Sequence, residues 1–155
     1  MKYVIDSDVI VSTHRYIPKQ IESFWDEFNK RFDTGELIII KPVYEEIRSN
    51  GNGEKDFVEE KNKEGLIVDV FESQDHLEAL KKLVNRFQKA MKGGFRDIAD
   101  PHLVAFALAN GYGVISYEKA SSRETLSAKI PDMCKEYSVK HFDLEGYLEE
   151  ENLKF

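Results

Sequence analysis

The chain has few of the residues that build disulfides, zinc centres or membrane spans. Its 155 residues include a single cysteine, Cys134, which rules out a disulfide within the chain and suits a reducing compartment. No Cys-x-x-Cys or His-x-x-x-His spacing is present, so a zinc site is not expected. No apolar run approaches the ~20 residues of a membrane span, and Asp6 interrupts the N-terminal apolar stretch too early for a signal peptide. We therefore expect a cytoplasmic protein that does not enter the membrane.

Acidic residues outnumber basic ones, and the two kinds are unevenly spread. The 29 Asp and Glu residues against 22 Lys and Arg residues give a net charge of −7, which argues against nucleic-acid binding through overall charge alone. Residues 81–96, called the basic segment below, contain no acid but six basic residues: Lys81, Lys82, Arg86, Lys89, Lys92 and Arg96. The end of the chain is acidic, so the molecule is expected to be bipolar.

Short apolar runs alternate with helical patterns along the whole chain. Strands are expected at residues 3–5, 37–40, 66–68, 114–117 and 138–142, from β-branched and aromatic runs. Helices are expected at residues 18–34, 42–47, 56–63, 74–91, 102–109 and 130–137 and in the acidic tail. Each of the four prolines lies near the expected start of a helix. This alternation predicts one α/β domain over residues 1–155, with a mainly parallel sheet between two layers of helices.

Four acidic residues lie where strands end or helices begin. Asp6 and Glu118 directly follow expected strands, while Glu46 and Asp100 lie near the starts of expected helices. In a parallel sheet these positions share one edge, so the four carboxylates are able to converge. Three of the four also have a structural explanation. Asp6 and Asp8 are suited to forming a turn, Glu46 to reaching water from the edge of a helix, and Asp100 to capping the helix that Pro101 opens.

Converging carboxylates repel one another unless a cation or a proton lies between them. A cluster of oxygen ligands alone suits Mg²⁺ or Mn²⁺ better than zinc or copper. Such a cation polarises phosphate oxygens and activates water. If the four acids converge, phosphodiester hydrolysis is the natural reaction class.

Four segments, residues 3–11, 43–47, 99–109 and 114–118, resemble the successive acidic motifs of PIN-domain ribonucleases, which include the VapC-like toxins of toxin–antitoxin pairs. The string Asp-Pro-His-Leu-Val-Ala at 100–105, the Ser-Tyr-Glu segment at 116–118 and the run at 129–135 together resemble the PIN-like DUF4411 group. The resemblance covers nearly the whole chain. It implies a PIN-like three-layer α/β/α fold and metal-dependent endoribonuclease activity.

The resemblance also assigns roles to individual residues. It implies that Mg²⁺ or Mn²⁺ is held by the acids at the motif positions Asp6, Glu46, Asp100 and Glu118, with Asp8 as a further candidate ligand. Asp8 departs from the family pattern, in which Asn, Thr or Ser is common. Ser116 takes the place of a supporting hydroxyl residue, and Asp97 is a rival to Asp100. An RNA substrate, an antitoxin partner and a homodimer are expected from the same resemblance.

Alternatives remain at this stage. The basic segment either keeps a helix face soluble or contacts RNA phosphates. In the second case charge reversal at Lys89 and Lys92 is expected to weaken RNA binding and flatten its salt dependence. The Ile-Asp-Ser-Asp-Val motif at 5–9 also fits haloacid-dehalogenase-type phosphatases, with Asp6 as the nucleophile and Lys129 as the downstream lysine, but no Gly-Asp-x-x-x-Asp follows. A third possibility is a catalytically silent PIN-fold binding module.

Overall fold

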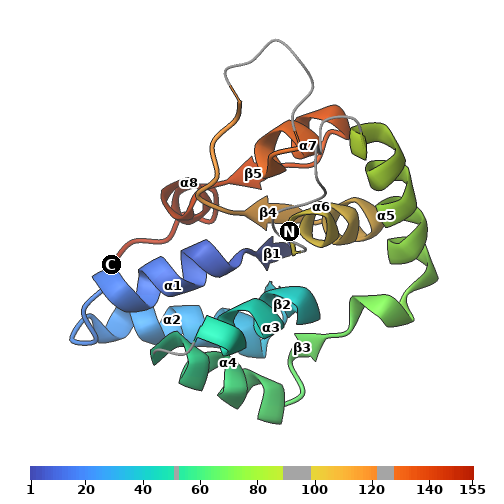
Figure 1. Cartoon of the computed structure of the whole chain (residues 1–155). Helices are drawn as coiled ribbons and strands as arrows, with labels where there is room; N and C mark the ends of the chain where they lie inside the picture. The colour runs from blue at the N-terminus through green and yellow to red at the C-terminus, as the bar shows by residue number, and fades with distance from the viewer. Residues whose placement is uncertain (51–52, 89–98, 122–127) are drawn as a thin grey trace.

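A computed structural model describes residues 1–50, 53–88, 99–121 and 128–155, and its strands form one sheet (Figure 1). All four strand pairs are parallel, and the order across the sheet is β3-β2-β1-β4-β5. The strands are β1 (Tyr3–Ile5), β2 (Leu37–Ile40), β3 (Ile67–Val68), β4 (Gly113–Ile115) and β5 (His141–Phe142). Because the chain runs outward from β1 to β3 and then returns to β4, the direction of winding reverses between β1 and β4. Open α/β sheets bind their ligands at such a switch point.

Helices connect every pair of consecutive strands. The described elements are α1 (Ser7–Tyr16), α2 (Glu22–Asp33), α3 (Lys41–Asn50), α4 (Gly53–Lys63), the short 3₁₀ helix η1 (Val70–Glu72), α5 (Gln74–Phe87), α6 (Ala99–Asn110), α7 (Ile130–Glu136) and α8 (Leu144–Glu150). None of these helices is both long enough and apolar enough to cross a membrane.

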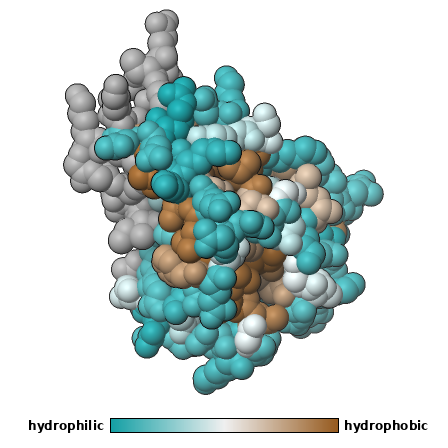
Figure 2. All heavy atoms as spheres, turned by 90° about the vertical axis from the view of Figure 1, so that its right-hand side faces the viewer, coloured by the Kyte–Doolittle hydropathy of each residue, from teal (hydrophilic) through white to brown (hydrophobic). Residues whose placement is uncertain are grey.

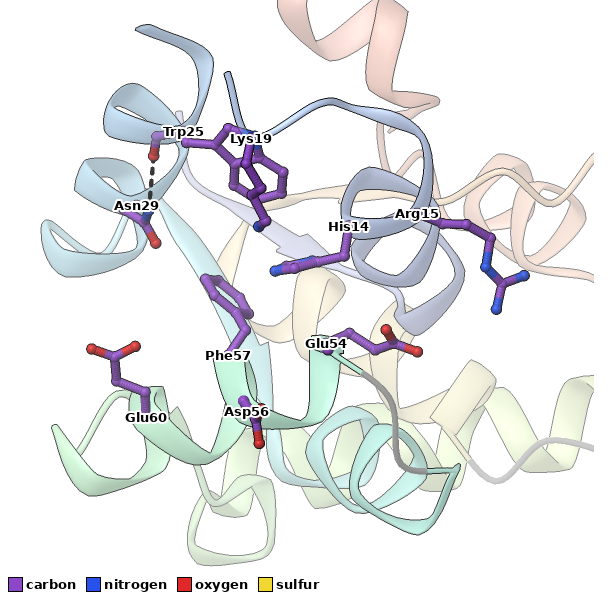
Figure 3. Close-up of a pocket in the computed structure, with 10 residues that line it drawn as sticks. His14, Arg15, Lys19, Trp25, Asn29, Glu54, Asp56, Phe57 and Glu60 are labelled. Carbon is purple, nitrogen blue, oxygen red and sulfur yellow. Dashed lines mark hydrogen bonds between the residues drawn. The ribbon is translucent and has the colours of Figure 1, made fainter. Parts of the chain in front are cut away.

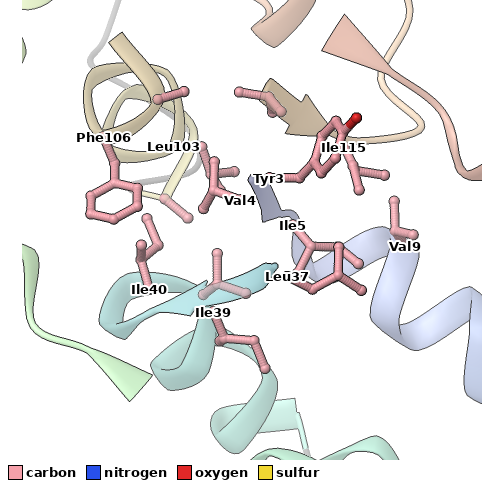
Figure 4. Packing of buried hydrophobic residues seen from close by; sticks show 14 of the residues in the cluster. Tyr3, Val4, Ile5, Val9, Leu37, Ile39, Ile40, Leu103, Phe106 and Ile115 are labelled. Carbon is pink, nitrogen blue, oxygen red and sulfur yellow. The ribbon is translucent and has the colours of Figure 1, made fainter. Parts of the chain in front are cut away.

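The two faces of β1 are covered by different helices, as the alternation of side chains along a strand requires. Figure 4 shows Val4 on the side of Leu103 and Phe106, which belong to α6. On the opposite face the ring of Tyr3 packs against Tyr147 of α8, with the ring centroids 4.9 Å apart. All five side chains are buried. The sheet therefore lies between two helical layers, which confirms the predicted architecture.

One glycine is required by this packing. Gly113 pairs with Tyr3 across β4 and β1, and a Cβ atom at position 113 would lie 2.8 Å from the Tyr3 ring. Any larger residue at position 113 would collide with the Tyr3 ring and disturb the pairing of β1 with β4.

Several predicted boundaries were wrong. No helix was expected at α1, yet it starts directly after Asp6; the helix predicted from Pro18 begins only at Glu22. Asp100 was expected to precede its helix as the N-cap but lies inside the first turn of α6, which begins at Ala99. Strand β4 ends at Ile115, before Tyr117, so residues 116–118 form a short extended exit from the sheet.

Candidate functional site

The N-terminus of α1 forms the centre of the candidate site. Asp6 follows β1 in extended conformation, with a ψ of 157°, and its Oδ1 accepts a hydrogen bond from the Ser7 N–H at 2.8 Å, so it caps α1. Its own N–H donates to the Ile115 carbonyl of β4 at 2.9 Å. Asp6 is only 5% exposed. A carboxylate is thus fixed in a buried position at the switch point of the sheet.

Ser7 links this centre to α3. Its Oγ donates a hydrogen bond to Glu46 Oε1 at 3.0 Å. On α3 the neighbouring side chains of Val43 and Ile47 are buried in the core, while Glu46 is half-buried. Glu46 is therefore directed toward α1, and this contact explains a charged residue on the inward-facing stripe of the helix.

Asp8 is held from the other side by the exit of β4. Its Oδ2 accepts a hydrogen bond from the Tyr117 N–H at 3.1 Å. Its Oδ1 is buried and has no hydrogen-bond partner among the described residues. A buried carboxylate oxygen without a donor is costly, which makes this atom a suitable ligand for a proton or a cation.

Three other acidic residues affect the pKa of Asp6. Burial raises the pKa of Asp6 well above its usual range, and the charges of Asp8 and Asp100 raise it further. Glu46 acts in the same direction, while the Ser7 N–H opposes them. Burial also raises the pKa of Asp8, against the lowering effect of a hydrogen bond with Asp6. The structure thus brings the charges of Asp8, Asp100 and Glu46, all predicted site residues, close enough to act on Asp6 and to favour its protonated form.

The side chains of this cluster carry the oxygen ligands that hard metal ions prefer, but they are not arranged as a complete set of metal ligands. In the described part of the chain, no three His, Cys, Asp or Glu side chains are arranged to hold a metal ion between them. The available donors are carboxylate oxygens, which suit Mg²⁺ or Mn²⁺. The unsatisfied Asp8 Oδ1 and the raised pKa of Asp6 are both relieved by a bound cation. The residues therefore fit such an ion chemically.

Ser116 and Glu118 lie next to the acids but make different contacts. The buried Ser116 Oγ is hydrogen-bonded to His141 Nε2 at 2.8 Å and accepts the Glu118 N–H at 3.2 Å. The Glu118 carboxylate accepts the N–H of Ile130, the first residue of α7, at 3.3 Å. The structure therefore places Ser116 behind the site, as a support, and directs Glu118 toward α7.

Two residues of this neighbourhood were missed by the sequence analysis. Ser7 was passed over between two aspartates, although the pattern Asp-Ser-Asp before Val9 and Ile10 is typical of a helix N-terminus. His141 was treated as one of four scattered histidines, and only the pairing of β4 with β5 shows that it reaches Ser116.

Other predicted residues lie elsewhere. Lys129, the lysine of the phosphatase alternative, is the exposed N-cap residue of α7. Lys89, Lys92, Arg96 and Asp97 lie outside the described residues.

A separate pocket of about 530 Å³ lies between α1, α2 and α4 (Figure 3). His14 packs between Trp25 and Phe57, with ring centroids 4.9 and 4.8 Å away. The Lys19 ammonium lies 3.2 Å from the centre of the Trp25 ring, in a cation–π contact. Acidic residues complete the lining, among them Glu54. None of the candidate site acids lines this pocket.

Two solved structures are similar to this chain over most of its length. A chain of VapBC2 from Rickettsia felis, bound to a DNA fragment from its promoter, matches with a TM-score of 0.55 at 15% identity and covers 92% of this chain and 98% of that one. A chain of VapBC-1 from nontypeable Haemophilus influenzae matches with a TM-score of 0.55 at 14% identity and the same coverage.

These matches show the fold, which is that of PIN domains. No curated protein matches the sequence. The model of DUF4411, a domain of unknown function, matches residues 3–155. The chain therefore belongs to the DUF4411 family.

Proposed function

We propose that this protein is a metal-dependent endoribonuclease of the PIN type, in which Asp6, Asp8, Glu46 and Asp100 bind Mg²⁺ or Mn²⁺. One observation carries the proposal: a buried carboxylate at the switch point of the sheet has its pKa raised by three further acids. Such groups of perturbed carboxylates gather at catalytic sites. The PIN fold, shared with VapBC proteins, supports the same reaction class.

The chain's own residues prepare this site for a cation. Ser7 holds Glu46, and the Tyr117 N–H holds one oxygen of Asp8 while leaving the other available. Ser116 and His141 fix the backbone that carries Tyr117. A divalent cation, when bound, supplies Lewis-acid polarisation of the phosphate and a water of lowered pKa.

RNA is the proposed substrate, and we propose that exposed residues of the basic segment contact its phosphates. Lys81 and Lys82 are exposed on α5, whereas Arg86 forms an ion pair with Glu136 of α7 at 2.9 Å. Neither of these two lysines forms an ion pair in the described part of the chain, so both remain able to contact phosphates.

An antitoxin partner is a further part of the proposal. It is supported by the fold shared with the VapBC proteins, and a cytoplasmic location belongs to the same proposal. A homodimer is proposed through the face that carries β3, η1 and α5. Figure 2 shows apolar side chains reaching the surface on this face, where Phe71 is 54% and Leu77 37% exposed.

The decisive test is cleavage of a labelled RNA with Mg²⁺ or Mn²⁺, against EDTA. We expect cutting only with metal, and its loss in Asp6→Asn and Asp100→Asn. Asp69→Asn is the matched control, because Asp69 caps η1 and lies outside the acidic cluster. Activity that survives both site substitutions would contradict the proposal. A well-folded protein that binds Mn²⁺ without cutting would support the silent binding module instead.

A further inference from the structure

A cavity of about 480 Å³ opens at the same edge of the sheet as the acids. It lies where β4 and β5 end, beside the first turns of α7 and α8. Its volume falls within the range of about 300–1,000 Å³ that is usual for small-ligand sites. The aromatic and charged residues of its lining are Tyr117, Glu118, Lys119, His141, Phe142 and Asp143.

The cavity adjoins the acidic site through shared residues. Tyr117 lines the cavity and donates its N–H to Asp8 Oδ2. His141 lines the cavity and is bonded to Ser116, and the charge of Asp8 acts on its ring. A ligand that reaches from the acids toward β5 therefore enters this cavity.

Three of the described lining residues carry flat rings, and among the described residues the acidic ones outnumber the basic one. Tyr117, His141 and Phe142 offer three rings, which suit a planar heterocycle. Glu118 and Asp143 add carboxylates, against one ammonium from Lys119. Carboxylates repel a phosphate, but they accept hydrogen bonds from the amino group of a base, as Asp and Glu do from cytosine N4.

We propose that this cavity is a nucleobase subsite, which binds a base with an exocyclic amino group from the nucleotide next to the scissile phosphate. The proposal rests on RNA being the substrate of the neighbouring acidic site. Stacking on Tyr117 supplies the affinity, and the carboxylates favour cytosine, adenine or guanine over uracil.

The test measures RNA binding without cleavage. Short fluorescent oligocytidine, oligoadenosine and oligouridine are titrated in EDTA at low salt, and anisotropy is recorded. We expect the wild-type protein to bind the first two at least several-fold more tightly than oligouridine. This comparison needs no variant, so it does not depend on the folding of a mutant.

Variants then locate the binding. Tyr117→Leu is expected to weaken oligocytidine binding about tenfold, since stacking of one base contributes about 1–3 kcal/mol. Tyr117→Phe keeps the ring and is expected to stay within about twofold of wild type. The control is Tyr16→Leu, which removes an aromatic side chain, 74% exposed, outside the cavity lining.

The outcomes separate this inference from the proposed function. Equal binding of oligouridine, no binding of any oligomer, or unchanged affinity in Tyr117→Leu would overturn the subsite. Base-selective binding together with absence of cleavage in Mn²⁺ would support the subsite while refuting the nuclease. Metal-dependent cleavage that shows no base preference would support the nuclease and contradict the subsite.

Discussion

Ser7 joins Asp6 to Glu46. Its N–H donates to Asp6 Oδ1 at 2.8 Å, and its hydroxyl donates to Glu46 Oε1 at 3.0 Å. Ser7 therefore both takes part in the capping of α1 and orients the Glu46 carboxylate on α3. Groups that orient ligands in this way commonly affect metal affinity as strongly as some ligands do.

Ser7→Ala is expected to weaken Mn²⁺ binding about tenfold, because Glu46 loses the donor that directs it toward Asp6. Stability is expected to fall by about 1–2 kcal/mol, the cost of removing a hydrogen bond to a charged group. Calorimetric titration with Mn²⁺ and urea unfolding measure the two effects. The control is Ser49→Ala, whose exposed hydroxyl donates only to the Glu45 carbonyl in the described contacts of α3. Wild-type affinity in Ser7→Ala would show that Glu46 is held in place without Ser7.

Asp6→Asn is expected to stabilise the metal-free protein at neutral pH. The pKa of Asp6 is raised in the folded state, so the folded protein binds a proton that the unfolded chain has lost. Stability due to this group is therefore present below the ordinary pKa near ~4 and is lost as pH rises through the raised value. Asn keeps the capping oxygen and removes the charge. Urea unfolding in EDTA between pH 4 and pH 8 should show a flatter profile for the variant.

The same variant should lose the stabilisation that Mn²⁺ gives the wild-type protein, because the cation loses a carboxylate ligand and has less negative charge to neutralise. Asp69→Asn, which alters a capping aspartate outside the cluster, should change neither the pH profile nor the effect of Mn²⁺. If Asp6→Asn were less stable than wild type at pH 8 in EDTA, this would contradict the claim that the ionised Asp6 destabilises the folded protein.

The architecture could be predicted from sequence because β-branched runs such as Ile38–Ile40 and the prolines at 42 and 131 are local signals. Helix α1 was missed because a three-residue strand passes directly into it without a glycine or proline. Its polar first turn therefore resembled a loop. Val9, Ile10 and Thr13, all buried, have the three- and four-residue spacing of a helix face.

The candidate site was predictable only as far as the placement of residues at strand ends. Asp6 and Glu46 could be assigned to one edge of the sheet, but the bond between Ser7 and Glu46 spans 39 residues and that between Ser116 and His141 spans 25. Such pairs depend on the direction of each side chain in the folded protein. The same limit applies to Glu118, whose carboxylate contacts Ile130 of α7, 12 positions further along the chain.

Glu118→Gln is expected to leave Mn²⁺ affinity within about twofold of wild type and to reduce stability by about 0.5 kcal/mol. The amide still accepts the Ile130 N–H, but the negative charge at the start of α7 is lost. Glu118→Ala also removes the acceptor and should cost about 1 kcal/mol in total. Titration calorimetry and urea unfolding measure both quantities. A tenfold loss of Mn²⁺ affinity in Glu118→Gln would instead support the sequence-based prediction that Glu118 is a metal ligand.

A pair of histidines joins α5 to α6 beneath the surface. The Nε2 of His76 and the Nδ1 of His102 are 2.9 Å apart, and their rings are nearly parallel, with an interplanar angle of 9°. His76 is fully buried. Burial, together with the smaller effect of the neighbouring His102, lowers the pKa of His76 to about 4. The pair is therefore held in its neutral form, with one ring donating and the other accepting.

His76→Gln is expected to make the protein less sensitive to acid. In the wild type the unfolded chain takes up a proton below the ordinary histidine pKa of ~6.5, whereas folded His76 resists protonation down to about 4. The stability that depends on His76 is thus fully present above pH ~6.5 and falls as the pH decreases toward about 4. At pH 5 the loss is on the order of 1–2 kcal/mol. Urea unfolding at pH 5 and pH 7 tests this, with the exposed Asn85→Gln on α5 as the control. Because Asp6 contributes with the opposite sign in both proteins, the difference between wild type and variant isolates His76. An equal loss of stability in His76→Gln would mean that other groups cause the acid sensitivity.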